Sequence, residues 1–429
     1  MMQVIQFPNE ADYASLFQRP MLEQKNLEDL INSVFTEVKS RGDEALKAYT
    51  KQFDGVDLRE LRCSNEEIEE AKSVVTEELK SAIKQAKANI ERFHKTQLQP
   101  KSKEVETTEG VVCWREQRAI QKVGFYIPGG TAPLFSSVLM LGVPASLSGC
   151  KEIVLCSPPN NEGKIHPAIL YTADLVGIKS IYKVGGAQAI AAMAIGTQSI
   201  PAVFKIFGPG NQYVTAAKMK AQQLGIAIDM PAGPSEVLVI ADATANPRFV
   251  AADLLSQAEH GIDSQVILLS DSLQLIEDVN DELVQQLAAL PRKKIAQEAL
   301  SHSKSVLFHS LEECLKASNF YAPEHLILAS DEGDNLLSEI QNAGSVFVGH
   351  YSCESLGDYA SGTNHTLPTH GYAANYSGVS IDSFMKQVTF QKVSAQGIQN
   401  IGPAVEIMAE AESLFAHKNA VTTRLNALK

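Results

Sequence analysis

The stretch KIFGPGNQYVTAAKMKAQQLG, residues 205–225, joins a short apolar run, a glycine-rich turn and a helix-like segment. The same order of features recurs in the runs KVGFYIPGG (122–130), EIVLCSPP (152–159) and SIYKVGG (180–186). Helix-like segments such as AQAIAAMAIG (187–196) follow these runs. Alternating strands and helices are typical of a mostly parallel, doubly wound sheet. We therefore expect one α/β unit over residues 124–235.

The alternation resumes after residue 235 and predicts a second α/β unit. Its expected strands are EVLVIAD (236–242), QVILLSD (265–271), SVLFHS (305–310), EHLILAS (324–330) and SVFVGH (345–350). Helices are expected near 246–260 and over the long stretch 273–301. The predicted fold class is α/β, with two Rossmann-like doubly wound domains, one inserted in the other, and small N-terminal and C-terminal helical appendages.

The N-terminal part of the chain is rich in helix signals. Ser64 and Glu67 match a capping box, and apolar residues recur at helical spacing as far as Phe93, so a single helix is expected over 64–97. Because the helices from about 25 to 97 bring too few strands to close a core, we group them with the second unit. The expected divisions are an N-terminal appendage (1–22), a first α/β domain (23–123 with 236–380), an inserted second domain (124–235) and a C-terminal appendage (381–429).

Composition narrows the range of partners. The 429 residues carry 37 Lys plus Arg against 50 Asp plus Glu, a net charge of −13 that disfavours nucleic acid and anionic membranes. The N-terminus lacks a basic segment followed by an apolar run, and no later stretch has the length of a membrane span. Six scattered cysteines without a CxxC pair argue against a disulfide framework. We expect a cytoplasmic protein.

Two residue pairs could carry chemistry. Gln257 and His260 are three residues apart near the end of a predicted helix, so both could reach one metal ion, although a histidine before Gly261 more often caps the helix. Glu324 and His325 begin a predicted strand and could share proton transfers. Since successive strand residues point to opposite faces, the spacing alone favours one of these two being solvated.

A polar segment, residues 349–378, concentrates reactive side chains. It contains few aliphatic residues but carries Glu354, Asp358, Asn364, His365 and His370. A surface loop would explain the polarity, yet loops dense in histidine and carboxylate are where site residues gather. We favour a site here and assign no role to His370.

Three glycine-rich strand ends could meet a phosphate group. They are IPGGTAP (127–133), VGGAQAIA (184–191) and FGPGNQYV (207–214), each between a predicted strand and a helix. None is a G-x-G-x-x-G followed by a ribose-binding acid, so a dinucleotide would be held in an uncommon manner. Tight turns in a sheet would use the same glycines.

Eight motifs, taken in order, resemble the histidinol dehydrogenase family over nearly the whole chain. They are YIPGGTAPLFSSVLML (126–141), GGAQAIAAMA (185–194), FGPGNQYVTAAK (207–218), DMPAGPSEVLVIAD (229–242), SQAEHG (256–261), APEHL (322–326), ESLGDYASGTNHTLPT (354–369) and AHKNAV (416–421). The resemblance implies a zinc- and NAD-dependent enzyme that oxidises L-histidinol through its aldehyde to L-histidine. It also implies a homodimer whose C-terminal appendage completes the partner's site.

The resemblance also implies roles for individual residues. Zinc would be bound by Gln257, His260, Asp358 and His417. Glu324 would activate a water and His325 would accept the alcohol proton. The NAD site would include Tyr126, Gln188 and Asn211. The substrate would contact Ser235, Gln257, His260, His325, Asp358, Glu412 and His417.

Three rival functions remain open from the residues. A thiol-based aldehyde oxidiser would use Cys113 or Cys150, although a buried, unreactive cysteine explains each more simply. A zinc hydrolase without nucleotide would leave the glycine-rich strand ends unexplained. A metal-binding or assembly protein without activity would leave the Glu324-His325 pair unused.

Overall fold

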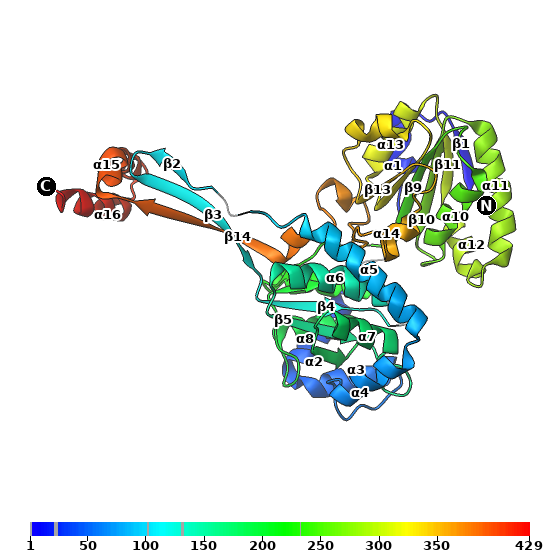
Figure 1. Ribbon diagram of the computed structural model, residues 1–429, viewed down its shortest axis with the longest axis horizontal. Helices are drawn as coiled ribbons and strands as arrows, with labels where there is room; N and C mark the ends of the chain where they lie inside the picture. Colours follow the sequence, from blue (N-terminus) through cyan, green and yellow to red (C-terminus); the bar gives the residue numbers. More distant parts are fainter. Residues whose placement is uncertain (1, 21–24, 101–102, 130–132, 232) are drawn as a thin grey trace.

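The computed structural model describes residues 2–20, 25–100, 103–129, 133–231 and 233–429. Two α/β bodies lie next to each other, and a long arm leaves them and carries the C-terminus (Figure 1). The α/β class with two Rossmann-like units is thus confirmed. Among the described residues, no helix has both the length and the apolar character that a bilayer span requires.

One body contains a five-stranded parallel sheet. In spatial order its strands are β6 (Ser180–Lys183), β5 (Glu152–Ser157), β4 (Lys122–Tyr126), β7 (Lys205–Phe207) and β8 (Ala227–Ile228). Its helices are α2 (Lys25–Arg41), α3 (Asp43–Phe53), α4 (Asn65–Val74), α5 (Glu77–Lys95), α6 (Phe135–Ser148), α7 (Pro167–Leu175), α8 (Gly186–Ile195) and α9 (Gln212–Gln223). The chain winds outward from β4 in both directions, which places a switch point between β4 and β7.

The early helices cover this sheet. Ile31 and Leu46 pack in the core on one face, and Ile83 and Ile90 pack in the core on the other. The packing differs from our grouping of residues 23–123 with residues 236–380. The apolar stripes of α2 to α5 fill faces that α6 to α9 leave open, and sequence order does not show which sheet has open faces.

Two long predicted helices are interrupted. The Ser64–Glu67 capping box forms as predicted, but the single helix over 64–97 is wrong, because Val75 is extended and Thr76 caps α5 through Leu79 N. The stretch 273–301 divides at Leu290, which is also extended and precedes a proline. In both cases a local cap or proline outweighs the apolar periodicity.

The second body contains a six-stranded parallel sheet. In spatial order its strands are β1 (Gln3–Gln6), β11 (Lys304–Leu307), β10 (Gln265–Ser270), β9 (Glu236–Ala241), β12 (His325–Ala329) and β13 (Ser345–Val348). Its helices are α1 (Tyr13–Leu16), α10 (Pro247–Ala258), α11 (Leu273–Ala289), α12 (Lys293–Ser301), α13 (Leu311–Tyr321) and α14 (Glu354–Tyr359). Leaving β1 aside, the winding repeats that of the first sheet, with the switch point between β9 and β12.

The N-terminal segment joins this second body. β1 pairs with β11 as an edge strand, and Tyr13 and Leu16 of α1 are buried against the sheet. Residues 3–20, which we expected as an appendage, therefore form part of the six-stranded body.

The arm is built from two segments distant in sequence. β14 (Met385–Val393) pairs antiparallel with β3 (Val111–Ala119), which pairs with β2 (Val105–Thr108). At the tip lie α15 (Ala395–Ala411) and α16 (Phe415–Asn426). We predicted the helical character of the C-terminal stretch but not these strands. Alternation in VTFQKV (388–393), where Phe390 stacks on Trp114 at 5.2 Å, was the available signal.

Candidate active site

Glu324 and His325 lie at the amino end of β12. Helix α13 ends at Tyr321 because Ala322 adopts a left-handed conformation, with φ 53°, and Pro323 follows. Both side chains are buried, and Glu324 Oε2 lies 3.6 Å from His325 Nδ1. The interpretation that one of the two is solvated is therefore wrong. Glu324 precedes the strand, so strand alternation does not turn it away from its neighbour.

The His325 imidazole is contacted on both sides. Its Nδ1 lies 3.0 Å from the Glu236 carbonyl oxygen and 3.0 Å from Gln257 Nε2. Its Nε2 lies 3.5 Å from Asp358 Oδ1. The structure thus brings together four residues that the sequence analysis placed in one site.

Burial and charge oppose each other at this pair. Burial alone would lower the pKa of His325, but the neighbouring carboxyl groups of Glu324 and Asp358 raise it to about 10. Burial raises the pKa of Glu324 to about 8, although the His325 charge opposes the shift. Burial likewise raises the pKa of Glu354 to about 7. The imidazole therefore lies among more carboxylate groups than it can neutralise, which favours an added cation.

The predicted metal ligands within the body fit a metal ion. Gln257 is buried on α10, and its Oε1 has no hydrogen-bond partner. His260 follows the same helix, and burial lowers its pKa, which favours a neutral imidazole. Asp358 lies on α14, and the neighbouring His325 lowers the pKa of its carboxyl against the opposing effect of burial. Among the described residues, no three His, Cys, Asp or Glu side chains are gathered as ligands, so this set depends on the glutamine.

The polar segment 349–378 supplies supporting residues as well as Asp358. His365 Nδ1 lies 2.9 Å from the Asp358 carbonyl oxygen, and its Nε2 lies 3.1 Å from Ser137 Oγ. Ser256 donates to Glu354 Oε1 at 2.8 Å. The preference for a site over a surface loop agrees with these contacts. Glu354 was noted in the sequence only as part of a polar cluster, and its burial is what distinguishes it.

The predicted nucleotide residues lie at the carboxyl end of the five-stranded sheet. Tyr126 ends β4, and its hydroxyl accepts a hydrogen bond from Gly186 N at 3.2 Å. Gln188 is buried in α8, two residues after that glycine. Asn211 caps α9 by accepting from the backbone of Tyr213 and Val214. The three glycine-rich segments do connect strands to helices, although Gly130, Thr131 and Ala132 fall outside the described residues.

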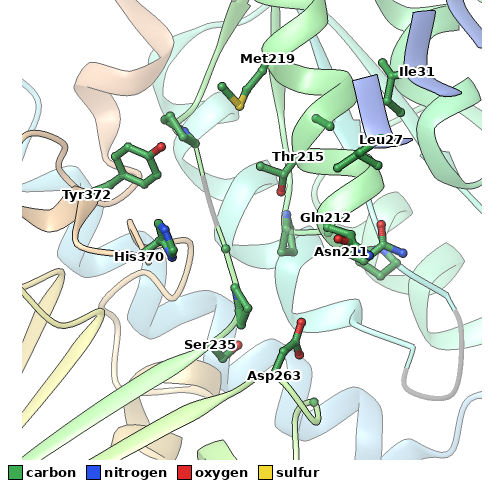
Figure 2. A pocket seen from close by; sticks show the side chains of 18 of the residues that line it. Leu27, Ile31, Asn211, Gln212, Thr215, Met219, Ser235, Asp263, His370 and Tyr372 are labelled. Atoms are coloured by element: carbon green, nitrogen blue, oxygen red, sulfur yellow. The ribbon is translucent and has the colours of Figure 1, made fainter. Parts of the chain in front are cut away.

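A pocket of about 670 Å³ lies between the two bodies and is lined by residues of both. Figure 2 shows Asn211 and Thr215 of α9 on one side, and Ser235 and His370 on the other. His260 also lines this pocket. Its volume is in the range of small-molecule and cofactor sites. A ligand lying along α9 would thus extend to His260, one of the predicted metal ligands.

Two predicted site residues lie far from this pocket. Glu412 ends α15, and His417 lies on α16, at the tip of the arm (Figure 1). Both are exposed. A single chain therefore does not bring them to the other predicted ligands.

The cysteines offer little support for thiol catalysis. All six are free. Burial raises the pKa of Cys150 to about 11, which disfavours the reactive thiolate. Cys113 lies on β3 of the arm, and the described lining of the pocket includes neither residue.

Comparisons with known proteins agree with this arrangement. The family model described as histidinol dehydrogenase matches residues 17–425. The chain is 56% identical to a histidinol dehydrogenase of Bacteroides thetaiotaomicron over 100% of both chains, and 51% identical to one of Aliivibrio fischeri over 98% of this chain and 95% of that one. A crystal structure of histidinol dehydrogenase from Elizabethkingia anophelis is 58% identical, covers 100% of this chain and 98% of its own, and superimposes with a TM-score of 0.97. The chain therefore belongs to the histidinol dehydrogenase family.

Proposed function

We propose that the chain oxidises L-histidinol through bound L-histidinaldehyde to L-histidine, with two hydrides passing in turn to two NAD molecules. The observation that carries this proposal is the buried Glu324–His325 pair, held against Gln257 and Asp358, together with a pocket along α9 that reaches His260. A base at the reacting carbon and a long neighbouring pocket suit hydride transfer to a dinucleotide.

His325 and Glu324 would divide the proton transfers. His325 Nε2 would accept the alcohol proton while hydride leaves the substrate carbon. Glu324 would then take a proton from the water that hydrates the aldehyde, and His325 would accept a proton in the second oxidation. Each transfer needs a base within hydrogen-bond reach of the reacting group, and the two bases lie side by side.

Gln257, His260 and Asp358 would hold a zinc ion, with His417 of a second copy as the fourth protein ligand. Zinc would anchor the substrate's imidazole and amino nitrogen atoms and offset the negative charge of the surrounding carboxylates. Glu412 of the second copy would pair with the substrate ammonium group, and Ser235 would line the substrate site. We also propose a homodimer, and we retain the prediction of a cytoplasmic location.

The direct test is a stoichiometry. Purified protein is mixed with histidinol, NAD and zinc, and NADH absorbance is compared with the histidine formed. We expect two NADH per histidine, loss of activity on chelation, and about one zinc per chain by elemental analysis. A folded, metal-loaded protein that makes no NADH would contradict the proposal and favour the hydrolase or binding-protein alternatives.

A further inference from the structure

Both catalytic side chains are held by the backbone of one residue, Glu236, the first residue of β9. Its N–H donates to Glu324 Oε2 at 2.9 Å. Its carbonyl oxygen lies 3.0 Å from His325 Nδ1. The Glu236 carboxylate does not take part in these two contacts and binds Arg19 instead.

The Glu236 carbonyl selects one form of the imidazole. A carbonyl oxygen only accepts, so the contact requires a proton on His325 Nδ1, and in the neutral imidazole the lone pair is then on Nε2, on the Asp358 side. Gln257 is compatible with this form, because its Nε2 group can donate to the Glu354 carboxyl instead, which leaves Oε1 free for a metal ion. The position of the Glu236 peptide therefore sets where the base points.

An arginine from the N-terminal segment fixes that peptide. Arg19 Nε and a terminal nitrogen bind the two Glu236 carboxylate oxygens at 2.5 and 3.0 Å. The same guanidinium donates to the Tyr321 carbonyl at 2.7 Å and lies 3.8 Å from the centre of the Tyr321 ring. His370 N donates to Glu236 Oε1 at 2.9 Å. The side chains of Glu236 and Arg19 are only 3% and 15% exposed, so the bidentate pair is well shielded from water.

We propose that Arg19 and Glu236 are a positioning pair for Glu324 and His325. The ion pair holds the start of β9, and its peptide groups orient both bases. The hydrogen bonds of the two side chains go to each other and to backbone groups, so we infer that they act through the bases rather than on the substrate. The inference rests on the proposed function, and a wild-type control that makes NADH from histidinol separates the two.

The test compares Arg19→Met, Arg19→Lys, Glu236→Gln and the double variant Arg19→Met/Glu236→Gln. We expect each neutral single variant to lose about 10- to 100-fold in kcat, with the KM for histidinol and the zinc content unchanged. Arg19→Lys should recover part of the loss, because the charge remains but the bidentate contact does not. The double variant should lose no more than the worse single one, as expected for two residues acting as one unit.

The double variant also keeps the test valid if a single variant fails to fold, since it leaves no unpaired buried charge. If it is folded and has the wild-type kcat, the proposal is wrong. A loss of zinc content as large as the loss of kcat would also overturn the proposal. So would a rise in the KM for histidinol that accounts for the whole loss of activity. The matched control is Arg248→Met, which removes a mostly exposed guanidinium 3.8 Å from Glu282 and should leave all parameters unchanged. Independently of activity, ¹⁵N-histidine spectra, with His325→Gln used for assignment, should show the protonated Nδ1 in the wild type and its loss in Arg19→Met.

Discussion

His325 and Glu324 are neighbours in sequence, yet they make different contacts, in keeping with the different roles that we propose for them. The imidazole begins β12 and faces Asp358, whereas the carboxylate lies just outside the strand and accepts from the Glu236 backbone. A base for the alcohol and a base for water can therefore occupy adjacent positions. This arrangement allows the two oxidations to be separated by substitution.

His325→Gln should slow NADH formation from both histidinol and histidinaldehyde by roughly 10²- to 10⁴-fold, because both oxidations lose their general base. Glu324→Gln should slow histidinaldehyde oxidation more than histidinol oxidation, because only the former needs a water activated. Steady-state rates with each substrate provide the measurement. The control is His350→Gln, whose imidazole pairs with Asp331 on the surface at 3.0 Å and should change neither rate. Equal losses in both steps for Glu324→Gln would contradict the assignment.

A second prediction at the residue scale concerns stability and pH. Burial raises the pKa of Asp253 on α10 to about 7, from an ordinary value of 3.8. The folded state therefore binds a proton that the unfolded state releases, and the free energy of unfolding falls as pH rises from about 4 to about 7. Asp253→Asn removes this cost, so it should stabilise the protein increasingly over that range, by roughly 2 kcal/mol at pH 8.

Denaturant unfolding at several pH values between 4 and 8 would measure this effect. Asp281→Asn on the neighbouring helix α11 is the matched control, because that carboxyl is exposed and its loss should change stability by at most about 0.5 kcal/mol at any pH. A gain for Asp253→Asn that does not depend on pH would show that burial of the charge is not the cause.

At the scale of elements, the loop between β7 and α9 connects the sheet to the pocket. Lys218 of α9 is buried, pairs with Asp229, and donates to the Gly208 carbonyl at 3.0 Å. The Gly208 N–H in turn donates to Asp229 Oδ2 at 2.8 Å. The loop is therefore held at both peptide groups of one glycine, and Asn211 follows at the start of the helix.

Gly208 itself cannot carry a side chain. Its φ is +134°, and an added Cβ would lie 2.1 Å from the Tyr126 carbonyl oxygen. Gly208→Ala should therefore destabilise the protein by several kcal/mol and raise the KM for NAD. Gly225→Ala, just after the same helix, is the control: its φ is +89° with nothing within 4 Å, so only roughly 1–2 kcal/mol of backbone strain is expected. Thermal unfolding of both variants tests the difference, and equal losses would mean that the contact with β4 is unimportant.

At the scale of the whole molecule, the arm separates Glu412 and His417 from the rest of the predicted site. Its tip exposes large apolar side chains, among them Ile407, Met408 and Phe415, each more than 60% exposed. Such a surface suits burial against another chain. Exchange of arms between two copies would bring the missing ligand and the ammonium-binding carboxylate to each site.

Subunit mixing tests this exchange. His325→Gln and His417→Gln homodimers should each be nearly inactive. After unfolding and refolding together, half of the dimers should be mixed, and one of their two sites should have both histidines intact, giving about a quarter of wild-type activity. If His417 acted within its own chain, every mixed site would lack one histidine and the mixture would stay inactive. Mixing each variant with itself is the control.

Local sequence signals were enough to predict most strands and helices of both bodies, the Ser64 cap and the motifs that bring Gln257, Glu324 and Asp358 into one family pattern. These signals depend on contacts within a few residues, or on motif order, and a single sequence records both. The grouping of α2 to α5 with the five-stranded sheet was not predictable in this way. Which sheet faces need covering is a property of the packed whole.

The sequence by itself determined the fold class, the family and the residue types of the site. Only the tertiary structure decided that Glu324 and His325 are both buried and in contact, and that Arg19 and Glu236, more than two hundred positions apart, form one buried ion pair. The physical reason is that burial and charge pairing arise when distant segments pack together. The local sequence around a glutamate at the start of a strand, or around an arginine in the N-terminal segment, does not indicate that the two will pair.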